Sequence, residues 1–112
     1  MEIPSDAQLV RIYIGESDKS GHRPLYEVIV TEARKRGMAG ATVLRGMMGF
    51  GKNSRMHTTK ILRLSEDLPL VIEIVDSRER VQEFLPELNA MVTNGLVTVE
   101  NIQVEVYRHD KT

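Results

Sequence analysis

Residues 68–75 read LPLVIEIV and form the most apolar strand-like run of the chain. β-Branched residues dominate this run, and they favour strands because their side chains pack well on a pleated surface. Pro69 stands near the start of the run, where a missing backbone donor is tolerated. The run therefore predicts a central strand of a β-sheet.

A helix is predicted upstream of this strand, after Pro24. The fixed φ of proline suits a first helical position. The basic residues 34–36 favour the negative end of the helix dipole, and Gly37 stands at the expected C′ position. The apolar face of this helix has helical spacing and comprises Leu25, Val28, Ile29 and Ala33.

A second helix is predicted downstream of the strand. Asp76 and Ser77 offer a helix cap, and Glu79 occupies the place of a capping-box acid three residues after Asp76. Pro86 removes a backbone donor in the middle of the pattern, so the helix is expected to kink or split near Leu85. Residues 93–95, Thr-Asn-Gly, end it. Its apolar face is Val81, Phe84, Leu85, Leu88, Met91 and Val92.

Three further strands complete the pattern, at residues 9–14, 41–45 and 97–107. The second of these is expected to continue through Met47 or Met48, and the last to carry a bulge at Glu100 and Asn101, where its apolar positions change parity. The resulting order is βαββαβ. It predicts a ferredoxin-like α+β sandwich, with a four-stranded antiparallel sheet and both helices on one face.

The sheet face away from the helices is predicted to be half apolar, which favours burial against copies of the same chain. Single apolar residues tolerated on the surface are the alternative. The apolar positions assigned to this face are Leu9, Tyr13, Val43, Met47, Val71 and Val75. The polar ones are Arg11, Arg45, Glu73, Gln103 and Glu105.

Composition narrows the possible functions. A length of 112 residues fits a single domain, 1–112, with short polar tails at 1–7 and 108–112. A net charge of -1 argues against a general nucleic-acid binder, and the absence of cysteine excludes thiolate chemistry. The three histidines are scattered, so no metal site is predicted. No apolar run approaches membrane-spanning length, and a cytoplasmic location is expected.

Residues 45–64, RGMMGFGKNSRMHTTKILRL, differ from the rest of the chain. From position 49 to position 64 they carry four cations and no acidic residue. Such a local charge, together with glycines that can expose backbone N–H groups, indicates a site for an anion. A solvated, flexible loop over residues 49–60 is the alternative reading. The stretch nearly matches a P-loop, but Asn53 replaces the hydroxyl residue and the following residues look extended.

A catalytic role for this stretch has little support in the sequence. His57 could act as an acid or base, with Lys52 and Arg55 stabilising an anion. Nothing supplies a nucleophile with an oriented base, so no catalytic residue is assigned.

The chain resembles the PII-like family, a domain of unknown function related to the PII signalling proteins. The resemblance covers residues 9–108 and is carried by GATVLRGMMGFGKNSRMHTTKILRLSEDLPLVIEIVD at 40–76, FLPEL at 84–88 and NGLVTVENIQV at 94–104. It implies a ferredoxin-like fold assembled into a homotrimer, with a long loop after the second strand comparable to the T-loop. In PII proteins a nucleotide binds in the clefts between subunits, at the base of that loop.

Carried onto this chain, the resemblance and the charge pattern place an anionic ligand at the loop base. The candidate is an adenine nucleotide, AMP, ADP or ATP. The ligand-binding residues are then Gly46, Gly49, Gly51, Lys52, Arg55 and His57. Two features depart from the PII pattern: residues 93–98 contain no Lys or Arg to hold phosphates, and residues 38–95 contain no tyrosine to be modified.

The leading hypothesis is a regulatory, non-enzymatic protein. It would bind the small anionic effector and signal through the loop to a partner, such as a membrane transporter or an enzyme. The alternatives are a small enzyme acting on a phosphorylated substrate, or a ferredoxin-like protein that binds RNA or a metal.

Overall fold

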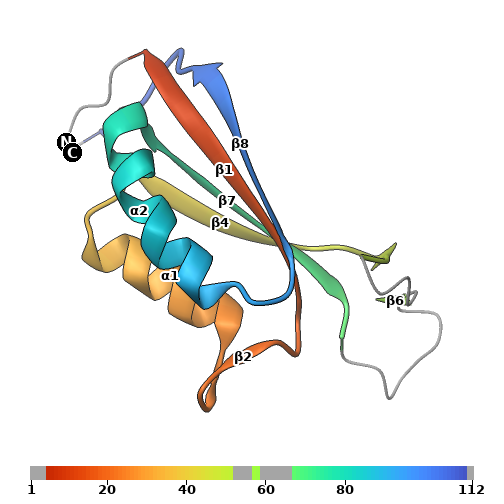
Figure 1. Cartoon of the computed structure of the whole chain (residues 1–112). Coiled ribbons are helices and arrows are strands. Elements are labelled where there is room, and N and C mark those ends of the chain that lie inside the picture. Colours follow the sequence, from red (N-terminus) through yellow and green to blue (C-terminus); the bar gives the residue numbers. More distant parts are fainter. Residues whose placement is uncertain (1–4, 52–56, 59–66, 111–112) are drawn as a thin grey trace.

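The main sheet has four antiparallel strands in the order β4-β7-β1-β8, and two helices, α1 and α2, cover one of its faces (Figure 1). The computed structural model describes residues 5–51, 57–58 and 67–110. The elements of the main layers are β1 (Asp6–Gly15), α1 (Leu25–Lys35), β4 (Gly40–Arg45), β7 (Pro69–Ser77), α2 (Arg78–Met91) and β8 (Leu96–Gln103). This arrangement confirms the predicted ferredoxin-like sandwich.

The apolar run at 68–75 forms β7, and the prediction that it lies centrally in the sheet is correct. β7 pairs with β1 from Ala7 opposite Ser77 to Gly15 opposite Pro69. From Pro69 to Asp76 its residues alternate between partly buried and buried, and Ile72 and Ile74 are completely enclosed. These side chains meet the apolar faces of both helices, including Ile29 of α1 and Phe84 of α2, in one core cluster.

The C-terminal end of α1 follows its predicted pattern. Gly37 adopts a φ of 72°, a left-handed conformation that glycine accepts without strain. The Gly37 N–H donates to the Arg34 carbonyl at 2.9 Å, and the Met38 N–H donates to the Ala33 carbonyl at 3.1 Å. These two bonds form a Schellman motif. At the other end the prediction is wrong by one position, because Pro24 is extended and serves as the N-cap.

The start of α2 depends on Ser77, which is the cap as predicted, and on Asp76, whose role differs from the predicted one. Ser77 is the N-cap, and its Oγ accepts from the Arg80 N–H at 3.3 Å, so the predicted Asp76–Glu79 capping box is wrong. The Asp76 carboxylate is fully buried. It accepts from the backbone N–H groups of Ser77 at 2.6 Å and Ala39 at 2.9 Å, and lies 3.2 Å from Arg80 Nε. Asp76 therefore ties the start of β4 to the start of α2.

The predicted split of α2 at Pro86 does not occur, because the helix continues through it to Met91. Pro86 lies on the exposed side of the helix. The carbonyl that loses its backbone donor is then able to face water, which keeps the cost of the proline low. No helix in the described part of the chain is long and apolar enough to cross a membrane.

Two strand predictions need correction at one end, and one predicted loop contains strands. β1 begins at Asp6, so the polar lead-in is shorter than predicted. β4 ends at Arg45, and the chain enters a separate ladder, in which β5 (Met48–Gly49) pairs with β6 (His57–Thr58). The predicted loop before α1 contains another short ladder, between β2 (Lys19–Ser20) and β3 (Arg23–Pro24).

The predicted bulge in β8 is also wrong. β8 pairs with β1 without interruption, from Asp6 opposite Gln103 to Tyr13 opposite Leu96. The change in parity has another cause: Asn101 takes a position on the helix side, where its Oδ1 accepts from Gln8 Nε2 at 2.9 Å. Gln8 Oε1 in turn accepts from Gln82 of α2 at 3.0 Å. The linked polar side chains of Asn101, Gln8 and Gln82 therefore take the place of the apolar residue that the alternating pattern of a strand predicts at position 101.

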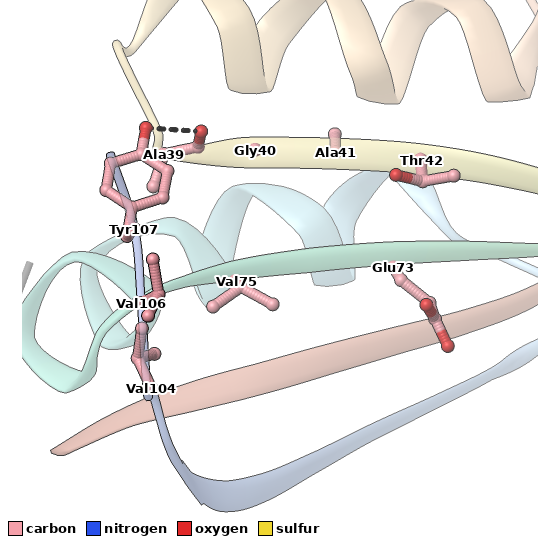
Figure 2. A pocket seen from close by; sticks show the side chains of 9 residues that line it. All are labelled: Ala39, Gly40, Ala41, Thr42, Glu73, Val75, Val104, Val106 and Tyr107. Carbon is pink, nitrogen blue, oxygen red and sulfur yellow. Dashed lines mark hydrogen bonds between the residues drawn. The ribbon is translucent and has the colours of Figure 1, made fainter. Parts of the chain in front are cut away.

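Residues 104–107 do not continue the last strand. They cross the ends of the strands on the outer face, the face away from the helices (Figure 2). The Val104 N–H donates to the Ser5 carbonyl at 2.6 Å, and the Tyr107 hydroxyl donates to the Ala39 carbonyl at 2.8 Å. We call residues 104–107 the C-terminal strap.

The register also corrects the predicted composition of the outer face. Val43 pairs with Ile72 and Arg45 with Leu70, so both lie on the helix side with their partners. Gln103 lies on the helix side by the same parity, and Met47 and Glu105 lie beyond the ends of the strands. The other assigned residues, Leu9, Arg11, Tyr13, Val71, Glu73 and Val75, do face outward. Leu44 takes the place that Val43 was expected to fill.

Replacing Asp76 by alanine is expected to lower the free energy of unfolding by about 3 kcal/mol, since two backbone N–H groups lose their acceptor and the Arg80 guanidinium loses its ion-pair partner. Ser77→Ala, which removes only the cap, should cost about 1 kcal/mol. Urea unfolding of both variants at one protein concentration measures the difference. An Asp76→Ala loss no greater than that of Ser77→Ala would contradict the role given to the carboxylate.

Candidate functional site at the loop base

Three segments converge at one end of the sheet and form the base of the long loop. They are residues 15–18 after β1, residues 45–51 from the end of β4, and residues 67–69 at the start of β7. Backbone hydrogen bonds join them: the Glu16 N–H donates to the Leu68 carbonyl at 2.8 Å, and the Gly46 N–H donates to the Pro69 carbonyl at 2.7 Å. The Ser17 N–H also donates to Asp67 Oδ1 at 3.1 Å. The loop therefore starts from a fixed frame.

The first part of the loop is extended, as the sequence predicted for its arms. Met48 lies opposite Thr58, and Gly49 lies opposite His57, in the β5–β6 ladder. The backbone of His57 is thereby brought beside Gly49. The predicted site residues Lys52 and Arg55 lie outside the described residues, as does most of the predicted flexible segment at 49–60.

The three glycines of the predicted site differ in their surroundings. A Cβ on Gly46 would lie 3.0 Å from Cγ of Pro69, and a Cβ on Gly49 would lie 3.3 Å from the same atom. Both glycines thus allow the loop to pack closely on the proline ring. The Gly46 N–H already donates to Pro69, whereas Gly51 is exposed, with nothing within 4 Å of an added Cβ. Only Gly51 combines an exposed backbone with open space.

Charged side chains from distant parts of the sequence also meet at the loop base. Arg45 forms an ion pair with Glu16, although 29 residues separate them. Asp18 Oδ2 accepts from the Gly15 N–H at 2.9 Å, and Asp67 Oδ1 accepts from the Ser17 N–H. Sequence reasoning missed these carboxylates because no local pattern joins them. Glu16, Asp18 and Asp67 thus place three carboxylates at the frame, against the one guanidinium of Arg45.

Apolar side chains are exposed where the loop leaves the sheet. Met47 is 76% exposed, Met48 60% and Phe50 66%. Large apolar side chains exposed to this degree in neighbouring positions are typical of a surface that contacts another molecule.

The outer face of the sheet carries two contrasting rows of side chains. Because Leu44 pairs with Val71, Val71 with Tyr13, and Tyr13 with Leu96, these four residues form one apolar row across all four strands. The next row is polar and places Thr42, Glu73, Arg11 and Thr98 side by side. We call them the apolar row and the polar row.

Arg11 is the central charge of the polar row. Its Nε lies 3.0 Å from Glu73 Oε2, and its Nη1 lies 2.7 Å from Glu100 Oε1. The hydrogen bond to Glu73 raises the pKa of the Arg11 guanidinium above its ordinary value, and the charge of Glu100 raises it further. One cation thus serves two carboxylates, Glu73 of the polar row and Glu100 of the neighbouring row.

Within residues 5–51, 57–58 and 67–110, no group of three or more histidine and carboxylate side chains is placed to hold a metal ion.

The amino-acid sequence has relatives of similar length. A UPF0166 protein of Aquifex aeolicus (strain VF5) is 36% identical over 97 residues, which cover 87% of this chain and 91% of the relative. A UPF0166 protein of Methanocaldococcus jannaschii is 34% identical over 99 residues, covering 88% and 91% respectively.

Solved structures with the same fold are PII-like proteins. The structure of CPII, a nitrogen regulatory PII-like protein from Thiomonas intermedia K12 bound to ADP, AMP and bicarbonate, matches with a TM-score of 0.60. Sequence identity is 20%, and the match covers 88% of each chain. A second structure of CPII, bound to ADP and bicarbonate, matches with a TM-score of 0.57 over the same share of each chain. At this identity the likeness establishes the fold.

The family follows from the sequence. The model of the DUF190 family, whose description reads "Uncharacterized ACR", matches residues 7–104, which cover the main sheet and both helices apart from Asp6. The chain belongs to the DUF190 family, and its fold is that of the PII-like proteins.

Proposed function

We propose that the chain is a PII-like regulatory protein that binds an adenine nucleotide at the loop base, between subunits of a homotrimer. The observation that carries the proposal is the fixed frame at residues 15–18, 45–51 and 67–69, from which the basic stretch departs, with four cations and no acid over residues 49–64. A rigid frame lowers the entropy cost of ordering a ligand beside it. The structures of CPII with ADP and AMP support the choice of ligand.

The predicted site residues take different roles in this proposal. Lys52 and Arg55 supply positive charge, and the backbone of Gly51 offers the most accessible N–H group. Gly46 and Gly49 position the loop on Pro69, since the Gly46 N–H is already used. The backbone of His57 lies opposite Gly49 in the β5–β6 ladder, and we propose His57 as a further ligand-binding residue.

The nucleotide preference follows from the absence of cations near the start of β8. Residues 93–98 contain no Lys or Arg, so a third phosphate would gain little from this segment. We therefore expect AMP and ADP to bind at least as tightly as ATP.

The proposed homotrimer buries the apolar row. Leu44, Tyr13 and Leu96 are each 39% exposed or more, and they lie in register with Val71 across all four strands. Burial against a second copy removes this surface from water, at about 25 cal/mol per Å² of apolar area. Self-association also places the loop base of one subunit beside its neighbour, as a shared binding cleft requires.

The proposed readout is docking of the loop on a partner, such as a membrane transporter or an enzyme. Met47, Met48 and Phe50 supply exposed apolar surface beside the basic stretch. Methionine side chains adapt readily to different surfaces, which suits a docking role. No residue is assigned a catalytic role.

The trimer is tested by light scattering after size exclusion. The parent protein is expected to elute with three times the 12.7 kDa mass of one chain. Val71→Glu should weaken assembly, because an unpaired carboxylate would be buried in the apolar row. Ala90→Glu, on the exposed side of α2, is the control and should leave the mass unchanged. A parent protein that is monomeric at micromolar concentration would show the proposed assembly to be wrong.

The effector site is tested by calorimetric titration with AMP, ADP and ATP. Replacing Lys52 and Arg55 together by alanine removes two charge-assisted contacts, each worth about 1.5 to 3 kcal/mol, so affinity should fall at least ~100-fold. The control is the Arg34→Ala/Lys35→Ala variant, which removes the same charge from the C-terminal end of α1. Equal affinities of the parent and the Lys52→Ala/Arg55→Ala protein would remove these residues from the site.

A further inference from the structure

The connection between α2 and β8, residues 92–95, contains an asparagine followed by a glycine. It enters the sheet beside the end of β1, which is also the end that holds the loop base (Figure 1). Asn94 and Gly95 are both exposed to solvent. An asparagine is most reactive toward its own backbone when glycine follows it, because no side chain shields the next amide nitrogen.

The packing of the chain requires glycine at position 95. A Cβ there would lie 2.6 Å from the Tyr13 carbonyl oxygen and 3.1 Å from side-chain atoms of Ile14 and Val92. Gly95 also has a φ of 152°, which residues with side chains rarely adopt. The fold therefore keeps an unshielded nitrogen directly after Asn94.

Hydrogen bonding leaves both reacting groups of this pair free. Within the described part of the chain, neither the Gly95 N–H nor the Asn94 side chain forms a hydrogen bond. The other described asparagines are held. Asn89 lies inside α2, where the following N–H donates to the helix, and Asn101 lies in the β1–β8 ladder with its Oδ1 accepting from Gln8.

We propose that Asn94 is a site of spontaneous deamidation. The Gly95 nitrogen loses its proton and attacks Cγ of Asn94, the bond from Cγ to Nδ2 breaks, and ammonia leaves with that proton. The product is a five-membered succinimide ring, which one water molecule opens to aspartate or isoaspartate. Because the reaction is intramolecular, it requires no partner molecule other than water.

The consequence of this modification for the loop base rests on the proposed function. Gly95 packs against the Tyr13 carbonyl, two residues before the frame segment 15–18. A new carboxylate at position 94 adds to the three carboxylates of the frame and opposes a phosphate nearby. Isoaspartate also inserts one backbone carbon beside Gly95, which has no spare room. Deamidation is therefore expected to weaken ADP binding as the protein ages.

The reaction is tested by incubating the parent protein at neutral and at mildly alkaline pH. One tryptic peptide, residues 81–108, contains all three described asparagines, and fragment-ion mass spectrometry follows each of them. Conversion at Asn94 is expected to be at least tenfold faster than at Asn89 or Asn101. It should accelerate as the pH rises, because the attacking nitrogen must lose its proton. Labelling by isoaspartyl methyltransferase identifies the isoaspartate product.

The same incubation in urea separates the effect of the fold from that of the local sequence. The free N–H predicts little protection of Asn94, so its rate in the folded protein should lie within about tenfold of its rate in urea. Asn89 and Asn101 should be protected more strongly. A folded-state rate at Asn94 more than tenfold below the rate in urea, or no faster than at Asn89, would overturn the proposal.

Two variants test the consequence for the loop base. Asn94→Asp reproduces the aspartate product, whereas Asn94→Gln keeps the amide and closes a ring much more slowly. Calorimetric titration with ADP should give about tenfold weaker binding for Asn94→Asp than for Asn94→Gln. Gln103→Glu adds the same charge at the far end of β8 and should bind as the parent does.

The two proposals can fail separately. If the parent binds ADP and folded Asn94→Asp protein binds it equally well, the stated consequence of deamidation is wrong, while the nucleotide site stands. If the parent does not bind ADP, the proposed function fails, and the rates at the three asparagines still decide the deamidation site. Those rates are measured on the parent protein, so they do not depend on whether a variant folds.

Discussion

The antiparallel register between β1 and β7 is the constraint on which the other features depend. Nine pairs, from Ala7 opposite Ser77 to Gly15 opposite Pro69, hold the two central strands together. A shift of one residue would turn Ile72 and Ile74 out of the core and bring Val71 and Glu73 into it. The same pairing places Gly15 beside Pro69 at one end of the sheet and Asp76 near the start of α2 at the other. Both ends of the molecule are positioned by one ladder.

The two ends of the sheet differ in how they are built. Near Ser77, the buried carboxylate of Asp76 fixes the junction between β4 and α2, and the C-terminal strap crosses the outer face. Near Pro69, backbone hydrogen bonds hold the loop base while Met47, Met48 and Phe50 remain exposed. Exposed apolar surface and unbalanced charge lie next to a rigid frame, an arrangement suited to binding rather than to stability.

The sequence predicted the elements whose signals are local. The β-branched run of β7, the apolar spacing of α1 and the glycine after it each depend on neighbours within a few residues. Features set by pairing between distant strands were predicted less well. Val43 was assigned to the outer face because its parity relative to β7 depends on the β4–β7 register, which puts it opposite Ile72. The supposed bulge in β8 came from Asn101, whose partner Gln8 is 93 residues away.

In the candidate site, too, local features were predicted from the sequence and long-range contacts were not. Glycine and charge marked the loop in the sequence, but the packing of Gly46 and Gly49 on Pro69 required the fold. The ion pair between Arg45 and Glu16 joins residues far apart in the chain. Lys52 and Arg55 remain a prediction from the sequence, because they lie outside the residues that the structure describes.

Hydrogen exchange with and without ADP tests most directly the central claim that an effector binds at the loop base. The account predicts slower exchange on adding ADP at residues 15–18 and 45–51, with no change at Ile72, which already lies in the core. A change restricted to the end of the sheet near Asp76 and the C-terminal strap, or none at saturating ADP, would contradict it.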